Sequence, residues 1–201
     1  MGLIKVVNVC LVSASLLLTN ACQSAASQSK KAQTKPSQVA EDQWRELADS
    51  AGDFSLRFPK KPNYQTVNRR GGPVEEYTLA YDGCLFSFEY FKVEGEKTED
   101  GYRRMRNYIQ DQTIKANIQD GWRLLGQKVL PGNGYQTDWA VPSNGTMAYM
   151  RRQEYYRSSR AYAIAFFSYD YEDLDGELAG RFFLSLSFKK DGRATAGKSK
   201  E

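Results

Sequence analysis

The chain has 201 residues, with 28 Lys and Arg, 24 Asp and Glu, and no histidine. Its 41% hydrophobic and 26% charged residues are typical of a globular protein, which excludes a disordered chain and a multispanning membrane protein. The absence of histidine removes the most common general base and a common metal ligand. Three cysteines cannot build a disulfide framework.

The net charge of +4 belongs to the two ends of the chain. Residues outside 42–188 hold nine of the basic residues and three of the acidic ones, which leaves 19 basic and 21 acidic residues within 42–188. That segment therefore has a net charge of −2. A nucleic-acid-binding domain usually concentrates positive charge on its folded part, because neutralising phosphates supplies much of its affinity. We therefore expect no nucleic-acid partner.

Residues 1–21 have the features of an export signal. Lys5 supplies a positive charge, and a mostly apolar run of 13 residues follows at 6–18. A helix that spans a membrane needs about 20 apolar residues. The run therefore fits a cleaved signal peptide better than a permanent anchor.

The run from Leu18 to Cys22 resembles the lipobox of bacterial lipoproteins, in which the cysteine is acylated and becomes the first residue of the mature chain. The resemblance implies that Cys22 is the lipid attachment site, with palmitate among its acyl groups, and that the lipid anchors the protein in the cell envelope. Gln23 implies the periplasmic face of the outer membrane if the bacterium has two membranes. The alternative is a secreted or periplasmic protein that is cut after Ala25 or Ala26.

A single domain is expected between two flexible ends. Residues 22–41 are polar and contain no aromatic side chain, so they predict a flexible linker, and residues 189–201 predict a disordered basic tail. Cys84 is the one cysteine within the expected domain, 42–188. We expect it to be a buried, small apolar residue, because no histidine is present to activate a thiol.

Alternating apolar residues and turn signals predict a series of strands. The central strand should be 160–169, because apolar residues occupy both of its faces. Turns are expected at Asp82-Gly83, at residues 131–134 and at residues 143–145. The predicted strands are 54–58, 74–80, 85–93, 122–130, 135–141, 147–157 and 160–169.

Two helices are expected. Apolar residues recur at helical spacing over 99–118, and Thr98 is a plausible N-cap. A second helix is predicted over 173–183, followed by a short strand at 184–188. The order of elements predicts an α+β fold in which helices flank a mostly antiparallel β-sheet.

The segment from Phe54 to Pro62, FSLRFPKKP, resembles the opening of PsbP-like domains, which include DcrB-like bacterial lipoproteins. The order of elements and the later run from Arg181 to Ser185 are also similar to that superfamily. The resemblance implies an α/β/α sandwich over about 42–189. It implies no activity, because members act as assembly factors, stabilising subunits or protein partners. No metal- or partner-binding residue of the family matches this chain.

No catalytic, cofactor-binding or metal site is expected. Residues 170–177 are rich in acids, but a calcium loop placed there would need Tyr171 and Phe182 as ligands. Five further acids lie on or near the predicted strands and are not distinguishable from solvated strand residues, although they leave a carboxylate pair for glycoside hydrolysis open. They are Glu75, Glu76, Glu89, Asp138 and Glu154.

Five arginines form a candidate partner surface. They belong to the predicted helix and to an adjacent strand, and together they would attract an acidic protein or lipid headgroups. The alternative is an ordinary solvated face on which acids balance the arginines. The five are Arg103, Arg104, Arg106, Arg151 and Arg152.

These features predict a non-enzymatic, membrane-anchored envelope lipoprotein that binds another envelope protein or assists its assembly. The alternative is an envelope protein that binds a small ligand or a glycan, and that could be a weak hydrolase. Its cleft would be lined by tyrosines and by Trp44, Trp122 or Trp139.

Overall fold

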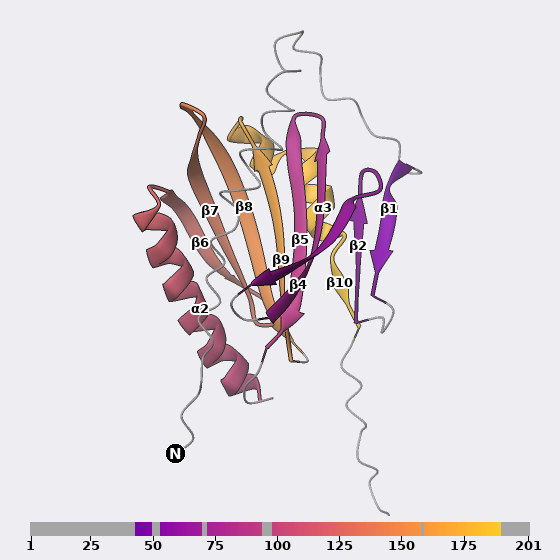
Figure 1. Ribbon diagram of the computed structural model, residues 1–201, viewed down its shortest axis with the longest axis vertical. Helices are drawn as coiled ribbons and strands as arrows, with labels where there is room; N and C mark the ends of the chain where they lie inside the picture. Colours follow the sequence, from indigo (N-terminus) through magenta and orange to yellow (C-terminus); the bar gives the residue numbers. More distant parts are fainter. Residues whose placement is uncertain (1–42, 50–52, 70–71, 94–97, 158, 190–201) are drawn as a thin grey trace, which may run out of the picture.

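The computed structural model describes residues 43–49, 53–69, 72–93, 98–157 and 159–189, which form two antiparallel sheets and two α-helices. Figure 1 shows the arrangement. The small sheet contains β1 (Arg45–Ala48), β2 (Phe54–Phe58) and β10 (Ser187–Phe188). The large sheet contains β3 (Asn63–Arg69), β4 (Gly72–Tyr81), β5 (Cys84–Lys92), β6 (Arg123–Leu130), β7 (Gly134–Ser143), β8 (Thr146–Arg157) and β9 (Arg160–Ser168). The helical elements are α2 (Glu99–Gln119), the 3-10 turn η2 (Glu172–Asp175) and α3 (Glu177–Leu184).

The large sheet has the strand order β3-β4-β5-β9-β8-β7-β6, so β9 lies at its centre, as its two apolar faces predicted. Tight turns join several of its neighbouring strands. At Asp82 and Gly83 both φ angles are positive, 52° and 75°, which is the conformation that a two-residue hairpin requires. In the predicted turn at 143–145, Asn144 and Gly145 also have positive φ angles, 47° and 79°.

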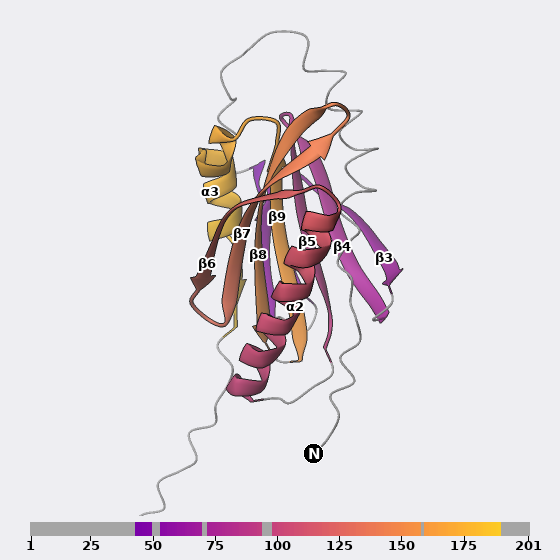
Figure 2. The same cartoon turned by 90° about the vertical axis from the view of Figure 1, so that its left-hand side faces the viewer.

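The two faces of the large sheet are covered differently. Helix α2 lies across one face, which we call the α2 face, as Figure 2 shows. The other face packs against the small sheet and α3, and we call it the β2 face. The prediction of a mostly antiparallel sheet with helices is confirmed. The second sheet on the β2 face was not predicted, because its outer strand β1 is short and mostly exposed.

Aromatic rings fill the core on the β2 face. Phe86 of β5 is fully buried, and its ring centroid lies 5.1 Å from that of Phe166 and 5.0 Å from that of Phe182. Phe58 of β2 also contacts Phe182 edge to face, at 5.1 Å. Each such side chain contributes about 1.5–3 kcal/mol when it is fully buried. This core therefore holds the small sheet and α3 on the large sheet.

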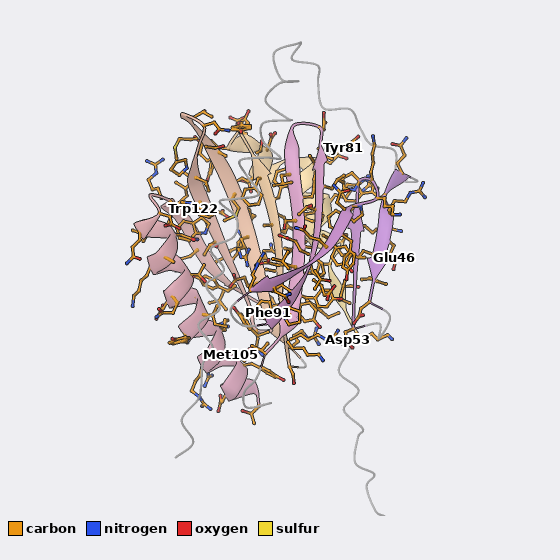
Figure 3. All side chains as sticks on the ribbon, in the orientation of Figure 1. Glu46, Asp53, Tyr81, Phe91, Met105 and Trp122 are labelled. Atoms are coloured by element: carbon orange, nitrogen blue, oxygen red, sulfur yellow. The ribbon has the colours of Figure 1, made fainter. Side chains whose placement is uncertain are left out.

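Two separate apolar clusters lie on the α2 face. Phe91 packs with Met105 and Ile109 of the first half of α2, whereas Trp122 packs with Trp139 beyond its end. Figure 3 labels Phe91, Met105 and Trp122 at these two ends. The strip of sheet between the clusters carries charged side chains, which are described below.

The boundaries of the helices differ in part from the predictions. Thr98 is the N-cap of α2, since its Oγ1 accepts a hydrogen bond from the Gly101 amide at 3.0 Å. The helix predicted over 173–183 is divided at Gly176, whose amide closes the 3-10 turn on the Asp173 carbonyl. The strand predicted over 184–188 is present only at 187–188, because α3 continues to Leu184.

Strands β1 and β3 were not predicted, and the reason lies in their exposure. Neither shows a clean alternation of buried and exposed residues. Their pairing depends on a neighbouring strand and not on a pattern of their own. In the described part of the chain no helix has the length and apolar character needed to cross a membrane.

Candidate functional site

A group of five charged side chains is buried on the α2 face, and we call it the charged belt. Glu76 and Glu89 are directly opposite each other on β4 and β5, and Ala163 of the central strand separates Glu89 from Glu154 of β8. Alanine is small, so long side chains from both sides can meet above the central strand. The belt consists of Arg69, Glu76, Glu89, Arg152 and Glu154.

Glu89 is the centre of the belt. Its carboxylate accepts from Arg69 Nη1 at 2.7 Å and from Arg152 Nη2 at 2.6 Å. Arg152 Nε also donates to Glu154 at 2.7 Å, and Arg69 approaches Glu76 at 3.5 Å. These contacts join β3, β4, β5 and β8 across the strand between them. The side chains of the belt are only 3–11% exposed.

The ionisation of Glu89 is fixed by its two arginines. Burial alone would raise the pKa of this carboxyl, but Arg152 and Arg69 outweigh it, and the pKa of Glu89 is lowered. Burial also raises the pKa of Tyr156, whose hydroxyl donates to Glu154 at 3.2 Å. Glu89 is therefore held as an anion, and its lowered pKa makes it a poor proton acceptor near neutral pH.

The charged belt was not predicted from the sequence. Glu76, Glu89 and Glu154 were not distinguishable from solvated strand residues, yet their exposed fractions are 2%, 4% and 7%. One local signal was available, since the alternation of β5 puts Glu89 on the same face as Leu85 and Phe91. The partner Arg69 has no such signal, because it lies at the end of an unpredicted strand.

The five candidate arginines do not form one basic surface, and that part of the prediction is wrong. Arg151 and Arg152 are neighbours on a strand, so their side chains point to opposite faces of the large sheet. Arg152 belongs to the charged belt. Arg151 lies on the β2 face, where it binds Asp138 at 2.8 Å and Asp175 at 2.7 Å. Its Nη1 also donates to the Leu174 carbonyl at 2.8 Å, which ties η2 to β8.

The three arginines of α2 remain together on the helix. Arg103 pairs with Asp100 at 2.7 Å, and both side chains are more than 60% exposed. Arg106 donates to the side chain of the neighbouring Asn107. Arg104 also has interacting partners. Binding of a partner by these three residues stays a prediction.

The cysteine predictions divide between the described and undescribed residues. Cys84 is buried, as expected, with an exposed fraction of 6%. Burial is the main cause that raises its thiol pKa to about 12, so the thiolate is scarce near neutral pH. Cys22, the predicted lipid attachment site, lies outside the described residues, as do nearly all of the signal, linker and tail.

The three tryptophans do not line a common cleft. Trp122 and Trp139 pack against each other on the α2 face, at a centroid distance of 6.1 Å, and both are buried. Trp44 lies on the β2 face and is 6% exposed. It borders a shallow groove beside α3 together with Arg57, Gly180 and Leu184.

Acidic side chains of segment 170–177 form hydrogen bonds and an ion pair with other residues of the protein. Asp173 accepts a hydrogen bond from the Ser168 hydroxyl, and Asp170 accepts from the Glu172 amide at 3.0 Å. Asp175 pairs with Arg151. No group of three acidic or cysteine ligands able to hold a metal ion occurs among the described residues.

No protein-family model matches the chain, and no curated protein sequence matches it. The solution structure of the cyanobacterial PsbP protein CyanoP from Synechocystis is similar over 78% of this chain and 98% of that chain. The identity is 10% and the TM-score is 0.49.

Two crystal structures are also similar. One is from Bacteroides thetaiotaomicron, and the similarity covers 75% of this chain and 50% of that chain. The identity is 16% and the TM-score is 0.44. The other is a protein of unknown function from Pseudomonas aeruginosa, titled a putative regulator. The similarity covers 66% of this chain and 86% of that chain, with 13% identity and a TM-score of 0.39.

Proposed function

We propose that the chain is a membrane-tethered envelope lipoprotein whose PsbP-like domain binds another envelope protein or assists its assembly. The domain is attached through an acyl group on Cys22 and the linker 22–41. Its fold in this proposal is the α/β/α sandwich of PsbP-like domains, and its class is that of the DcrB-like lipoproteins. No catalytic step is part of this proposal.

Two features of the sequence support the anchored, PsbP-like part of the proposal. The lipobox-like run ends at Cys22, directly after the apolar part of the signal. The segment from Phe54 to Pro62 resembles the opening of PsbP-like domains, and its first five residues form β2. An acylated protein needs no membrane-spanning helix, since more than one acyl chain gives stable attachment.

The ion pairs of the charged belt are the observation that favours a binding role. The belt is the largest assembly of buried ionisable groups among the described residues, and each of its carboxylates already contacts a guanidinium. Such an arrangement fixes the positions of strands and does not favour proton transfer, because a general base needs a pKa near the working pH. This favours a rigid binding module over an enzyme.

The lipid anchor is tested by metabolic labelling with a palmitate analogue in the full chain. We expect labelling and membrane association to be lost in Cys22→Ser and retained in Cys84→Ser, which removes a thiol of the folded domain. Labelling of Cys22→Ser equal to that of the unchanged chain would contradict the lipid site.

The binding role is tested by crosslinking intact cells and purifying the full chain from solubilised membranes. We expect one envelope protein in stoichiometric amount. A screen of glycan fragments by thermal shift is the contrasting measurement, because a ligand that binds the native state raises the unfolding temperature. A clear shift with a glycan and no protein partner would favour the ligand-binding alternative.

A further inference from the structure

The large sheet has two free edges, and they differ in how they are protected. Among the described residues, β3 pairs only with β4, and β6 pairs only with β7. Figure 2 shows β3 at the outer side of the sheet, beside β4. An edge strand presents unpaired backbone donors and acceptors, to which another chain can add a strand. Proteins normally block such edges with charges, prolines, bulges or short strands.

Strand β6 carries such protection. Its pairing register with β7 shifts between Leu124 and Gly126, and it contains Arg123 and Lys128. The outer strands of the small sheet are protected by their length, since β1 has four residues, two of them charged, and β10 has two.

Strand β3 lacks this protection. Its seven residues pair with β4 in one continuous register, without a bulge. Residues 63–68 contain neither proline nor a charged side chain. The only charge, that of Arg69, is directed into the buried belt. The chain therefore leaves an uncharged strand at this edge although it protects the other edge of the same sheet.

A carboxylate of β4 lies beside this edge. Glu75 of β4 is directly opposite Thr66, and it accepts hydrogen bonds from the hydroxyls of Tyr64 and Thr66. No described Lys or Arg forms an ion pair with it. Tyr64 is 58% exposed, and its ring lies 5.0 Å from that of Tyr77. A carboxylate beside the exposed ring of Tyr64 attracts a cation through charge and cation–π contacts.

We propose that the edge of β3 is a docking site for an extended strand of a basic partner protein. The partner's strand pairs with the backbone of β3, and one of its Arg or Lys side chains crosses Thr66 to reach Glu75. The belt shows that this distance is feasible, because Arg69 on β3 reaches Glu89 two strands away. The inference rests on the proposed protein-binding function and names the chemistry of the partner.

A second copy of this chain fits the edge less well. The only cation of β3 is Arg69, and its guanidinium is already bound to Glu76 and Glu89. Pairing of two β3 strands would therefore bring neither Glu75 carboxylate an unpaired cation from the β3 strand of the other copy. A different chain with basic residues at alternate positions supplies a cation that can pair with Glu75.

The test uses a fluorescent, terminally blocked octapeptide of alternating Arg and Val, titrated against the full chain in detergent micelles. The matched control is the same peptide with Glu in place of Arg. Hydrogen exchange of the complex should show added protection in residues 63–69 and not in β6. Equal binding of the two peptides, or protection confined to β6, would overturn the proposal.

Two variants locate the contact. Glu75→Gln should weaken binding of the Arg peptide about fivefold, which is what one partly exposed ion pair contributes. Thr66→Lys should weaken it at least about tenfold, because the new lysine pairs with Glu75 and places a charge on the edge. Val129→Lys puts the same charge on the exposed part of β6, and binding should stay unchanged.

The remaining outcomes separate this proposal from the proposed function. A dimer of the full chain that Thr66→Lys dissociates, measured by sedimentation, would make a second copy the occupant and overturn the proposal. If Thr66→Lys still recovers the envelope partner from crosslinked cells, the β3 site is wrong and the binding function stands. Loss of that partner in Thr66→Lys, with its retention in Val129→Lys, supports both the β3 docking site and the proposed binding function.

Discussion

Glu89 has more influence on this structure than its place in the sequence indicates. It lies in a mostly apolar strand, and its two carboxylate oxygens accept hydrogen bonds from arginines that are 20 residues before it and 63 residues after it. A buried carboxylate without such partners would be strongly unfavourable. With them, it links the edge of the sheet at β3 to β8 on the far side of the central strand.

Replacing Glu89 should therefore destabilise the fold strongly. Glu89→Gln keeps the shape of the side chain but leaves two buried guanidinium groups without their shared anion. We expect a loss of about 3–5 kcal/mol in the free energy of unfolding, measured by urea denaturation. The matched control is Asp100→Asn, which removes an exposed ion pair on α2 and should change stability by less than about 1 kcal/mol. Equal effects of the two variants would contradict the importance of the belt.

The lowered pKa of Glu89 also predicts how stability depends on pH. A carboxyl whose pKa is lower in the folded state stabilises the protein above its ordinary pKa of 4.5. That contribution is lost as the pH falls through the folded-state pKa. We expect the free energy of unfolding to decline below about pH 4.5, and the decline to be shallower in Glu89→Gln. Parallel pH profiles of the two proteins would show that Glu89 is not responsible.

At the scale of the elements, two glycines illustrate why position matters more than residue type. Gly180 lies inside α3, and a Cβ there would meet no atom within 4 Å. Gly134 begins β7, and a Cβ there would lie 2.6 Å from a ring carbon of Tyr155 and 2.9 Å from Leu130 Cβ. The same substitution should therefore have opposite effects at the two sites.

Gly180→Ala should raise the free energy of unfolding by about 0.5–1 kcal/mol, because glycine is a poor residue inside a helix. Gly134→Ala should lower it by about 1–3 kcal/mol, because the tyrosine ring or the strand must move. Thermal unfolding of the two variants is the measurement. A stabilised Gly134→Ala would show that the contact with Tyr155 relaxes easily.

The elements that the sequence predicted are those with a local signal. The strands near 54–58, 85–93 and 160–169 alternate or are continuously apolar, and the helix from 99 has its N-cap at Thr98. The sequence contains no comparable signal for β1 or β3. Their residues are mostly exposed, so only the neighbouring strand gives them a conformation. This explains why the proposed docking edge could not be identified from the sequence.

At the scale of the whole molecule, the two sheets enclose an aromatic core on one side and α2 covers the other. The charges are distributed unevenly between the predicted domain and the two ends of the chain. The predicted domain, 42–188, has a net charge of −2, whereas the full chain has +4. The positive balance therefore lies outside the expected folded part.

Cutting the chain to residues 42–188 should leave a folded domain with opposite chromatographic behaviour. At pH 8 we expect this fragment to bind an anion exchanger and residues 23–201 to bind a cation exchanger, because only the longer form carries the basic linker and tail. Their midpoints of thermal unfolding should agree closely. A large drop in the midpoint for the fragment would show that the ends contribute to folding.

The sequence by itself determined most of the strands, the long helix and the central position of 160–169, because each follows from a local pattern of apolar residues. It also predicted the burial of Cys84, because no histidine is present to activate a thiol. Only the tertiary structure decided the rest: the second sheet, the opposite directions of Arg151 and Arg152, and the charged belt. Ion pairs between residues as far apart as Glu89 and Arg152 depend on which strands become neighbours. No local pattern contains that information, since strand order is set by packing of the whole chain.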